Sequence, residues 1–110
     1  MSTHHAASGE LIDLRPLAED LPQTASKTLV RSDHLEVFRL VLLAGKELPE
    51  HQVSSAITVQ CIEGAVEIKA HGRSQLMPAG SLLYLSGGVA HALKALEDSS
   101  ILVTMLVHRE

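Results

Sequence analysis

Aromatic residues and cysteines are scarce in this sequence, and their scarcity excludes several classes of protein. The chain has one phenylalanine, one tyrosine and no tryptophan, so it cannot offer a row of rings on which bases or sugars could stack. Its one cysteine, Cys61, excludes an internal disulfide framework and a zinc site built from several thiolates.

Positive charge is also limited, and long apolar runs are absent. Nine Lys and Arg residues stand against thirteen Asp and Glu residues, which gives a net charge of −4 at pH 7 without any basic cluster. This balance argues against a nucleic-acid partner and against an anionic membrane surface. The N-terminal segment lacks the basic and apolar regions of a secretory signal, and no apolar run approaches the ~20 residues that span a bilayer. We therefore expect a soluble, cytoplasmic protein without a membrane partner.

The chain has the length and composition of one globular domain. It contains 110 residues, of which 45% are hydrophobic and 20% charged, enough for one core. Residues 1–34 lack sustained periodicity and are expected to form an N-terminal arm, with one helical turn between Pro16 and Pro22. Residues 35–110 are expected to form the main domain.

Short strands are the dominant pattern after His34. Apolar and polar residues alternate in segments separated by Gly and Pro turns, and His71-Gly72 fits a two-residue hairpin turn. The expected strands lie within residues 34–45, 55–64, 65–70, 73–77, 81–86, 90–95 and 99–107. Seven or eight short strands without a long helix predict an all-β sandwich or barrel.

The last expected strand is apolar on both faces. The segment from Ile101 to Val107 reads ILVTMLV, so neither face is suited to water. We expect the N-terminal arm or a second subunit to cover it, and we predict a homodimer formed by sheet extension or by exchange of the arm.

Two of the seven histidines stand out because glycines frame them. His4, His5, His34, His71 and His108 lie near the termini, in a turn or before a strand, and are interpreted as solvated. His51 follows Gly45 after five residues, and Gly64 lies further on. His91 ends a second pattern, in which Gly80 is followed by five residues, Ser86, one residue, Gly88 and two residues.

These spacings resemble the two motifs of the cupin family, G-x5-H-x-H-x3,4-E-x6-G and G-x5-P-x-G-x2-H-x3-N. The resemblance covers residues 35–107, and the fifteen residues between Gly64 and Gly80 match the short spacing of small single-domain cupins. It implies a double-stranded β-helix, a jelly-roll barrel of the RmlC-like type (cupin 2 conserved barrel), preceded here by the arm.

The departures from the motifs bear on metal binding. Val53 stands where the family has its second histidine, Ile57 where it has glutamate, and Ser86 and Ala95 replace the proline and asparagine of the second motif. The family's metal site uses three imidazoles and one carboxylate, so this chain resembles a cupin with a degenerate metal motif. No cofactor is firmly predicted. The candidate is a divalent transition metal (Ni, Zn, Fe or Mn) held by His51 and His91.

Two further residues could complete the site. Cys61 has the parity to face the barrel interior and is the one soft candidate for a third metal ligand, although a lone cysteine is more often a small core residue. Tyr84 could act with a histidine in acid–base chemistry, as in sugar isomerases of this fold, but its parity is opposite to that of Leu83 and Leu85.

The sequence allows three interpretations of the histidine pair. The pair could be a relic or ligand-binding pair, a weak metal site completed by water, or an acid–base catalyst. The leading hypothesis is a small-molecule-binding cupin with a biosynthetic or sensing role. Its alternative is a metal-dependent enzyme of the dioxygenase or isomerase type with a sparse site. The predicted pocket residues are His51, Val53, Ile57, Cys61, His91 and Leu93.

Overall fold

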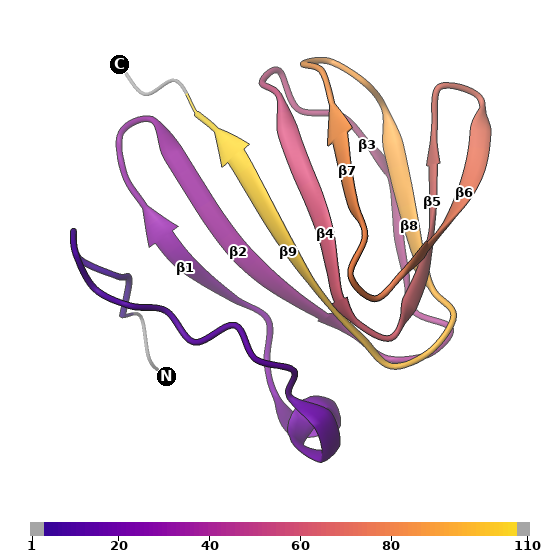
Figure 1. Cartoon of the computed structure of the whole chain (residues 1–110). Coiled ribbons are helices and arrows are strands. Elements are labelled where there is room, and N and C mark those ends of the chain that lie inside the picture. The colour runs from indigo at the N-terminus through magenta and orange to yellow at the C-terminus, as the bar shows by residue number, and fades with distance from the viewer. Residues whose placement is uncertain (1–3, 108–110) are drawn as a thin grey trace.

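Two antiparallel sheets packed face to face make up most of the molecule (Figure 1). The computed structural model describes residues 4–107, which form nine strands and one 3-10 helix. The larger sheet has the strand order β1-β2-β9-β4-β7 and the smaller has β3-β8-β5-β6. The elements are η1 (Ala18–Gln23), β1 (Lys27–Arg31), β2 (Leu35–Leu42), β3 (Glu47–His51), β4 (Ile57–Glu63), β5 (Ala65–Ala70), β6 (Arg73–Pro78), β7 (Leu82–Leu85), β8 (His91–Ala95) and β9 (Ser99–Leu106). The predicted all-β class is confirmed, and no helix in this part of the chain is long and apolar enough to span a bilayer.

The local patterns explain most of these elements. In β4 the residues Ile57, Val59 and Cys61 are buried while the intervening side chains are more exposed, as the alternation predicts. The helical turn after Pro16 is present as η1. The hairpin between β5 and β6 turns through His71 and Gly72, whose φ angles of 53° and 73° fit the expected two-residue turn.

Residues 1–34, expected as an arm without sustained periodicity, also contain a strand that the sequence pattern did not indicate. β1 pairs antiparallel with β2 and forms one edge of the larger sheet. A register shift between Thr28 and Val30 interrupts the pairing, and this irregularity hides the two-residue period in the sequence. The strand is therefore specified by its pairing with β2 rather than by local alternation.

A polar cluster under the arm attaches it to the larger sheet. The carboxylate of Glu63 accepts hydrogen bonds from the backbone N–H groups of Leu17 (2.7 Å) and Ala18 (3.0 Å) and from the Ser100 hydroxyl (2.8 Å). The Arg39 guanidinium lies 3.5 Å from the same carboxylate and donates to Ser100 and to a carbonyl oxygen of the arm. Burial by itself raises the pKa of Glu63, but these hydrogen bonds and the Arg39 charge outweigh it and hold the pKa below its ordinary 4.5.

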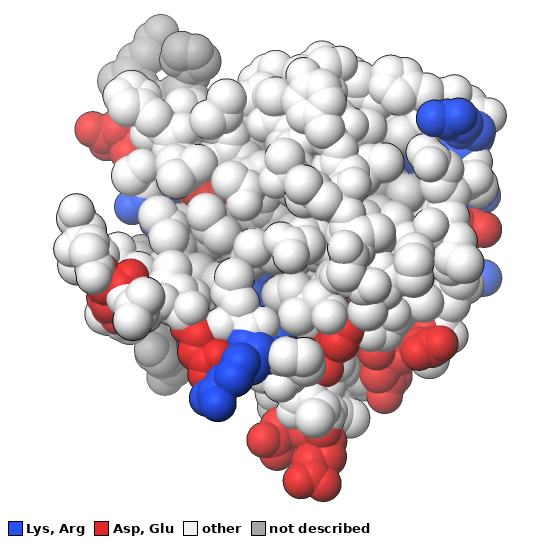
Figure 2. Space-filling view, in the orientation of Figure 1, with Lys and Arg blue, Asp and Glu red and all other residues white. Residues whose placement is uncertain are grey.

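The outer faces of the two sheets differ in charge. On the smaller sheet Lys94 pairs in register with Glu47 and with Glu67, as expected for a solvated face. The strands β9, β4 and β7 of the larger sheet present no Lys, Arg, Asp or Glu outward except Glu63, which the arm engages. In Figure 2 most of the upper half of the visible face is accordingly uncharged, and charged residues gather mainly along its margins.

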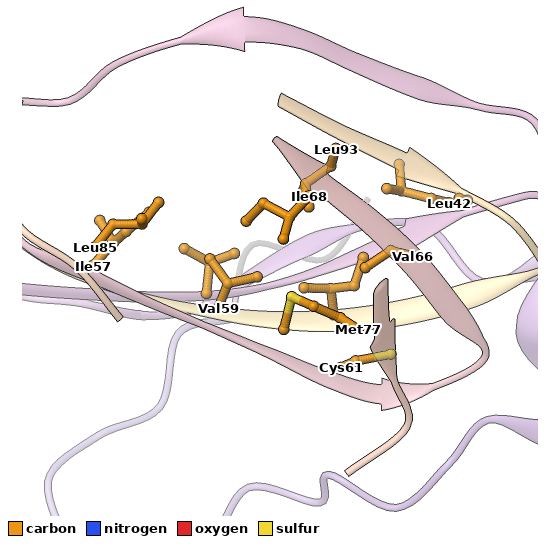
Figure 3. Packing of buried hydrophobic residues seen from close by; sticks show 12 residues of the cluster. Leu42, Ile57, Val59, Cys61, Val66, Ile68, Met77, Leu85 and Leu93 are labelled. Carbon is orange, nitrogen blue, oxygen red and sulfur yellow. The ribbon is translucent and has the colours of Figure 1, made fainter. Parts of the chain in front are cut away.

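The core lies between the two sheets and is almost entirely aliphatic. Figure 3 shows Ile57 and Leu85 at one end of the cluster and Cys61 and Met77 toward the other. The buried members are Leu42, Ile57, Val59, Cys61, Val66, Ile68, Met77, Leu85, Leu93, Ala95, Ile101 and Val103. Inward-facing residues of both sheets therefore fill the barrel, as in sandwiches built from alternating strands.

Candidate functional site

Two histidines from neighbouring strands face each other at one end of the barrel. His51 ends β3 and His91 begins β8, and the two residues are register partners. Their ring centroids lie 4.4 Å apart, with the ring planes tilted by 55°. His91 is only 4% exposed, whereas His51 is exposed. The predicted proximity of the two rings is confirmed, because antiparallel pairing aligns residues that lie far apart in the sequence.

Backbone carbonyls orient both rings in the same way. His51 Nδ1 lies 3.2 Å from the carbonyl oxygen of Pro49, and His91 Nδ1 lies 2.9 Å from that of Val89. Because a carbonyl oxygen can only accept, Nδ1 carries the proton in each ring and donates it. Within residues 4–107 neither Nε2 atom has a hydrogen-bond partner. Two imidazole nitrogens are therefore available to a ligand.

An apolar cavity of about 210 Å³ opens beside the two rings. Three of the residues expected in the pocket, Val53, Ile57 and Leu93, line it together with both histidines. The remaining wall is made by Phe38, Leu40, Leu48, Val59, Val103 and Met105. All six were missed. Phe38, Leu40, Val103 and Met105 lie on β2 and β9, which the two glycine-framed patterns do not mark, and Leu48 and Val59 lie within the first pattern but not at its motif positions. The alternation within β2 and β9 is the signal that could have found the four residues on those strands.

Cys61 was expected in this pocket and is not there. It is 0% exposed and lies in the core four residues along β4 from Ile57, about 13 Å at the usual rise of a strand. Its thiol contacts the carbonyl oxygens of Glu63 (3.5 Å) and Gly64 (3.8 Å). Burial and the charges of Glu63 and Glu97 raise the pKa of the thiol above its ordinary 9.0, so it stays protonated at neutral pH. The correct parity placed Cys61 inside the barrel but could not place it at the histidine end.

Tyr84 does not take part in the site. It is 65% exposed on the outer face of β7, while Leu85 next to it is buried. Tyr84 alternates with Leu83 and Leu85 along the strand, and this alternation predicts that Tyr84 faces outward. The acid–base interpretation therefore lacks its tyrosine.

The residues at the histidine end do not fit a metal centre with three protein ligands. Among residues 4–107 no group of three His, Cys, Asp or Glu side chains lies close enough to hold one ion. Val53 and Ile57 line the cavity where the cupin motif has its further ligands, and both are apolar. A catalytic zinc takes three protein ligands, and non-haem iron takes two histidines and a carboxylate. The described chain offers two imidazoles.

Two loops approach each other closely beside Val53, a residue of the cavity wall. The backbone N–H of Gly88 donates to the carbonyl oxygen of Val53 at 2.7 Å. A Cβ atom at Gly87 would collide with the carbonyl oxygen of Ser54. The sequence predicts only a tight turn at Gly87-Gly88, whereas the structure shows that a glycine is also needed for this approach.

Other depressions lie outside the barrel and are less suited to a small ligand. One of about 630 Å³ lies beside the β5–β6 hairpin and is lined by Glu50, Lys69, His71 and Arg73, among others. It is shallow and open to water, so its charged groups stay solvated. The smaller cavity at the histidine pair is the better candidate, because there apolar walls meet a few convergent polar groups.

Known structures show which fold this is, although the sequence itself matches no family model and no curated protein. A conserved protein of unknown function from Streptococcus pyogenes is 24% identical, with a TM-score of 0.74 over 100% of this chain and 97% of that one. A cupin superfamily protein from Desulfitobacterium hafniense is 16% identical, with a TM-score of 0.76 over 93% and 99%. An RmlC-like cupin family protein with a double-stranded β-helix fold, from Methanocaldococcus jannaschii, is 17% identical, with a TM-score of 0.74 over 91% and 94%.

Proposed function

Because the chain has the fold of the RmlC-like cupins, we propose that it binds a small, largely apolar molecule in the barrel cavity and holds one polar group of that molecule against His51 and His91. The fold by itself supports many activities, so the proposal depends on the site. The observation that carries it is the pairing of two unpartnered Nε2 atoms with an otherwise apolar cavity.

The cavity volume limits the size of the ligand. At about 210 Å³ it is somewhat larger than the engineered cavity of about 150 Å³ that holds benzene in another protein. It is smaller than the ~300 Å³ at which drug-sized pockets begin. The proposal therefore takes a ligand with about one ring, or a short aliphatic chain, as its apolar part.

The protonation pattern of the histidines sets the kind of polar group. When both rings are neutral and Nδ1 donates to the backbone, each Nε2 is a hydrogen-bond acceptor. His91 is 4% exposed and both rings border apolar walls, so a donor group on a molecule that enters the cavity would find these acceptors available. A ligand hydroxyl can donate to one Nε2 at a time, and a primary amine can donate to both. The proposed ligand class is accordingly a small apolar molecule with one donor group, such as a phenol or a short alcohol.

A matched pair of test ligands separates the apolar contribution from the polar one. Benzene and phenol differ by one hydroxyl, and each can be titrated while the methyl resonances of Leu93 and Val103 are followed by NMR. We expect both to shift these resonances and phenol to bind about three- to tenfold more tightly, as for one net hydrogen bond. The methyl groups of Ile68 and Ile101, outside the cavity lining, serve as the internal reference.

Variants then assign the difference to the histidines. In His51→Leu the preference for phenol over benzene is expected to shrink, because one acceptor is removed. His34→Leu changes an exposed histidine outside the cavity lining and is expected to preserve the preference. Titrations in which neither compound moves the cavity methyl groups would contradict ligand binding. An equal preference in wild type and His51→Leu would contradict the role of the pair.

A metal-dependent enzyme is the second candidate, and one observation favours it. Histidines that bind metals commonly donate their other ring N–H to a backbone carbonyl, which is the arrangement of both rings here. The missing third ligand argues for weak binding. Elemental analysis of protein purified without chelator, followed by titration with zinc, tests this candidate. Stoichiometric metal would favour the enzyme, and its absence together with binding of phenol would favour the ligand-binding protein.

A further inference from the structure

The side chain of Arg39 contains a buried hydrogen-bond donor that has no partner. Arg39 is 7% exposed, and its Nη2 lies 3.5 Å from the Glu63 carboxylate and donates to the carbonyl oxygen of Arg15 (2.9 Å) and to the Ser100 hydroxyl (3.1 Å). Its Nε is buried as well, but no group within residues 4–107 accepts a hydrogen bond from it. No other completely buried side-chain nitrogen or oxygen in that range lacks a partner. Because buried polar groups in folded proteins are nearly always paired, this donor marks a place that an acceptor can occupy.

A cavity of about 280 Å³ lies beside this residue, between the N-terminal arm and the outer face of the larger sheet. We call it the arm cavity. The arm runs along β1, where the N–H of Ala6 donates to the carbonyl oxygen of Leu29 at 2.8 Å, and then leads into η1 (Figure 1). Arg39 faces the arm rather than the barrel, because Phe38 and Leu40 on either side of it line the barrel cavity. The two cavities share no lining residue.

The walls of the arm cavity combine aliphatic side chains with positive charge. Ile12 and Leu17 of the arm and Leu29 of β1 supply apolar surface. Lys27 and Arg39 also line the cavity, and they are register partners on β1 and β2, so their side chains leave the sheet on the same face. Lys27 forms no ion pair with any other described residue. Like charges opposite each other repel, and an anion that enters between them turns this repulsion into attraction.

The carboxylates that border the arm cavity are already engaged by other groups. Asp13 accepts from the guanidinium of Arg15 at 2.7 to 3.1 Å, which lowers the pKa of its carboxyl to about 2. Glu10 accepts from the backbone N–H of Ala7 (2.9 Å), and one of its oxygens lies 2.8 Å from His4 Nε2. The arm therefore balances its own negative charge, and the two cations of the sheet are not used by these carboxylates.

We propose that the arm cavity binds the carboxylate of a small aliphatic acid. One carboxylate oxygen accepts a hydrogen bond from Arg39 Nε, the ammonium of Lys27 pairs with the same carboxylate, and the hydrocarbon chain packs against Leu17 and Leu29. One free buried donor and one free ammonium suit a monoanion, whereas a phosphate dianion takes more donors than these. This site is independent of the one proposed for the barrel.

The volume of the arm cavity limits the size of the acid. At about 280 Å³ it is nearly twice the ~150 Å³ of the engineered cavity that holds benzene in another protein. A carboxylate on a chain of about six carbons in all fits this space. Hexanoate is therefore the probe for the site.

An NMR titration of the full chain with hexanoate tests this proposal. The Arg39 Nε–H resonance and the methyl resonances of Leu29 report on the arm cavity, and those of Val103 report separately on the barrel cavity. We expect hexanoate to shift the arm-cavity resonances. 1-Hexanol keeps the chain without the charge, and inorganic phosphate keeps a charge without the chain. Each is expected to bind at least about tenfold more weakly than hexanoate.

Variants assign the affinity to the two cations. Lys27→Gln removes one charge from an exposed residue and is expected to weaken hexanoate binding about three- to tenfold. Lys46→Gln is the matched control, because Lys46 is also exposed but lies outside the cavity lining, and it should bind as wild type does. Arg39→Lys keeps the charge without Nε and is expected to abolish binding. Circular dichroism checks that it folds, and if it does not, the Arg39 Nε–H resonance of wild type decides.

Four results would overturn the proposal. The first is hexanoate that leaves the Arg39 Nε–H resonance unmoved, as expected when water alone meets this donor. The second is 1-hexanol or phosphate that binds as tightly as hexanoate, and the third is a Lys27→Gln variant with wild-type affinity. The fourth is hexanoate that shifts only the methyl groups of Val103, which would place it in the barrel cavity instead.

Discussion

The two ends of the barrel are built from the same strands, yet one is hollow and the other is filled. The open end contains His51, His91 and the cavity of about 210 Å³. The closed end contains Cys61 and Val66, both 0% exposed. β4 contributes to both ends, with Ile57 on the cavity wall and Cys61 in the packed core. The alternation of a strand therefore places side chains inside the barrel but does not decide whether they meet a void or a packed neighbour.

Close backbone packing explains the filling of the closed end. A Cβ atom at Gly64 would collide with Ser99 and with the carbonyl oxygen of Asp98, so the β4–β5 turn presses directly against the start of β9. The buried Ser99 hydroxyl accepts from the N–H of Ala65 (3.1 Å) and donates to the carbonyl oxygen of Glu97 (2.7 Å). These short contacts leave no room for a cavity. At the open end two imidazole rings and medium-sized aliphatic side chains face each other without such an approach.

The largest expected loss of stability comes from replacing a glycine by alanine, and each end of the barrel offers one such glycine. Gly64 and Gly88 have the same φ of 83°, but only Gly64 lies against other atoms. We expect Gly64→Ala to lower the free energy of unfolding by about 2 to 5 kcal/mol, from backbone strain and overpacking together. Gly88→Ala adds strain without a clash and is expected to lower it by about 1 kcal/mol. Urea denaturation measures both, and equal losses would contradict the contrast between the two ends.

The second-largest expected loss of stability comes from Glu63, whose carboxylate binds the N-terminal arm near the closed end. Glu63→Gln removes the charge that faces the buried Arg39 and is expected to lower the free energy of unfolding by about 2 to 3 kcal/mol at pH 7. Because the folded protein holds the pKa of Glu63 below 4.5, this carboxylate contributes stability above pH 4.5 and loses it as pH falls through the lowered value. Urea denaturation at several pH values should show a smaller acid loss in the variant. Glu47→Gln, on the exposed face of β3, is the control and should retain the wild-type pH dependence.

A third prediction asks whether the open end can be converted into a metal centre. Val53→His together with Ile57→Glu would restore the four-ligand pattern beside His51 and His91, because both residues already line the cavity. With zinc at about 100 times its dissociation constant, we expect the free energy of unfolding to exceed that of the apo variant by about 2.7 kcal/mol. Calorimetric titration should also show proton release. A Val53→Gln, Ile57→Gln variant adds polarity without the ligands and should show neither effect. Tight zinc binding by wild type would show that a third protein ligand reaches the ion beside His51 and His91.

The smallest expected change in stability comes from Val→Ile substitutions, which add one methylene to a core side chain at each end of the barrel. Val103 lines the cavity, whereas Val66 is completely buried in the closed end. Val103→Ile has space to occupy and is expected to change the free energy of unfolding by less than about 1 kcal/mol, while weakening the binding of benzene. Val66→Ile overfills a packed site and is expected to cost about 1 to 3 kcal/mol. Thermal denaturation of both variants, with benzene titrations of Val103→Ile, measures the difference.

Much of the fold could be predicted from the sequence, since local pattern encodes it. Two-residue alternation predicts strands such as β4, Gly72 allows the hairpin turn, and the glycine-framed spacing around His51 and His91 resembles the cupin motifs. Parity also predicts the outward orientation of Tyr84. Each of these properties depends on residues that are close together in the chain or on a spacing that can be counted.

Tertiary structure decided the rest, because it depends on which strands lie side by side. β1 is a strand because β2 pairs with it, and Cys61 is remote from the histidines because it occupies the other end of β4. Arg39 faces Glu63 and Ser100 only when β2, β9 and β4 are neighbours. The cavity arises from residues of both sheets, and its volume is what their packing leaves empty. Alternation along one strand says which side a residue faces, whereas the packing between strands says what it meets there.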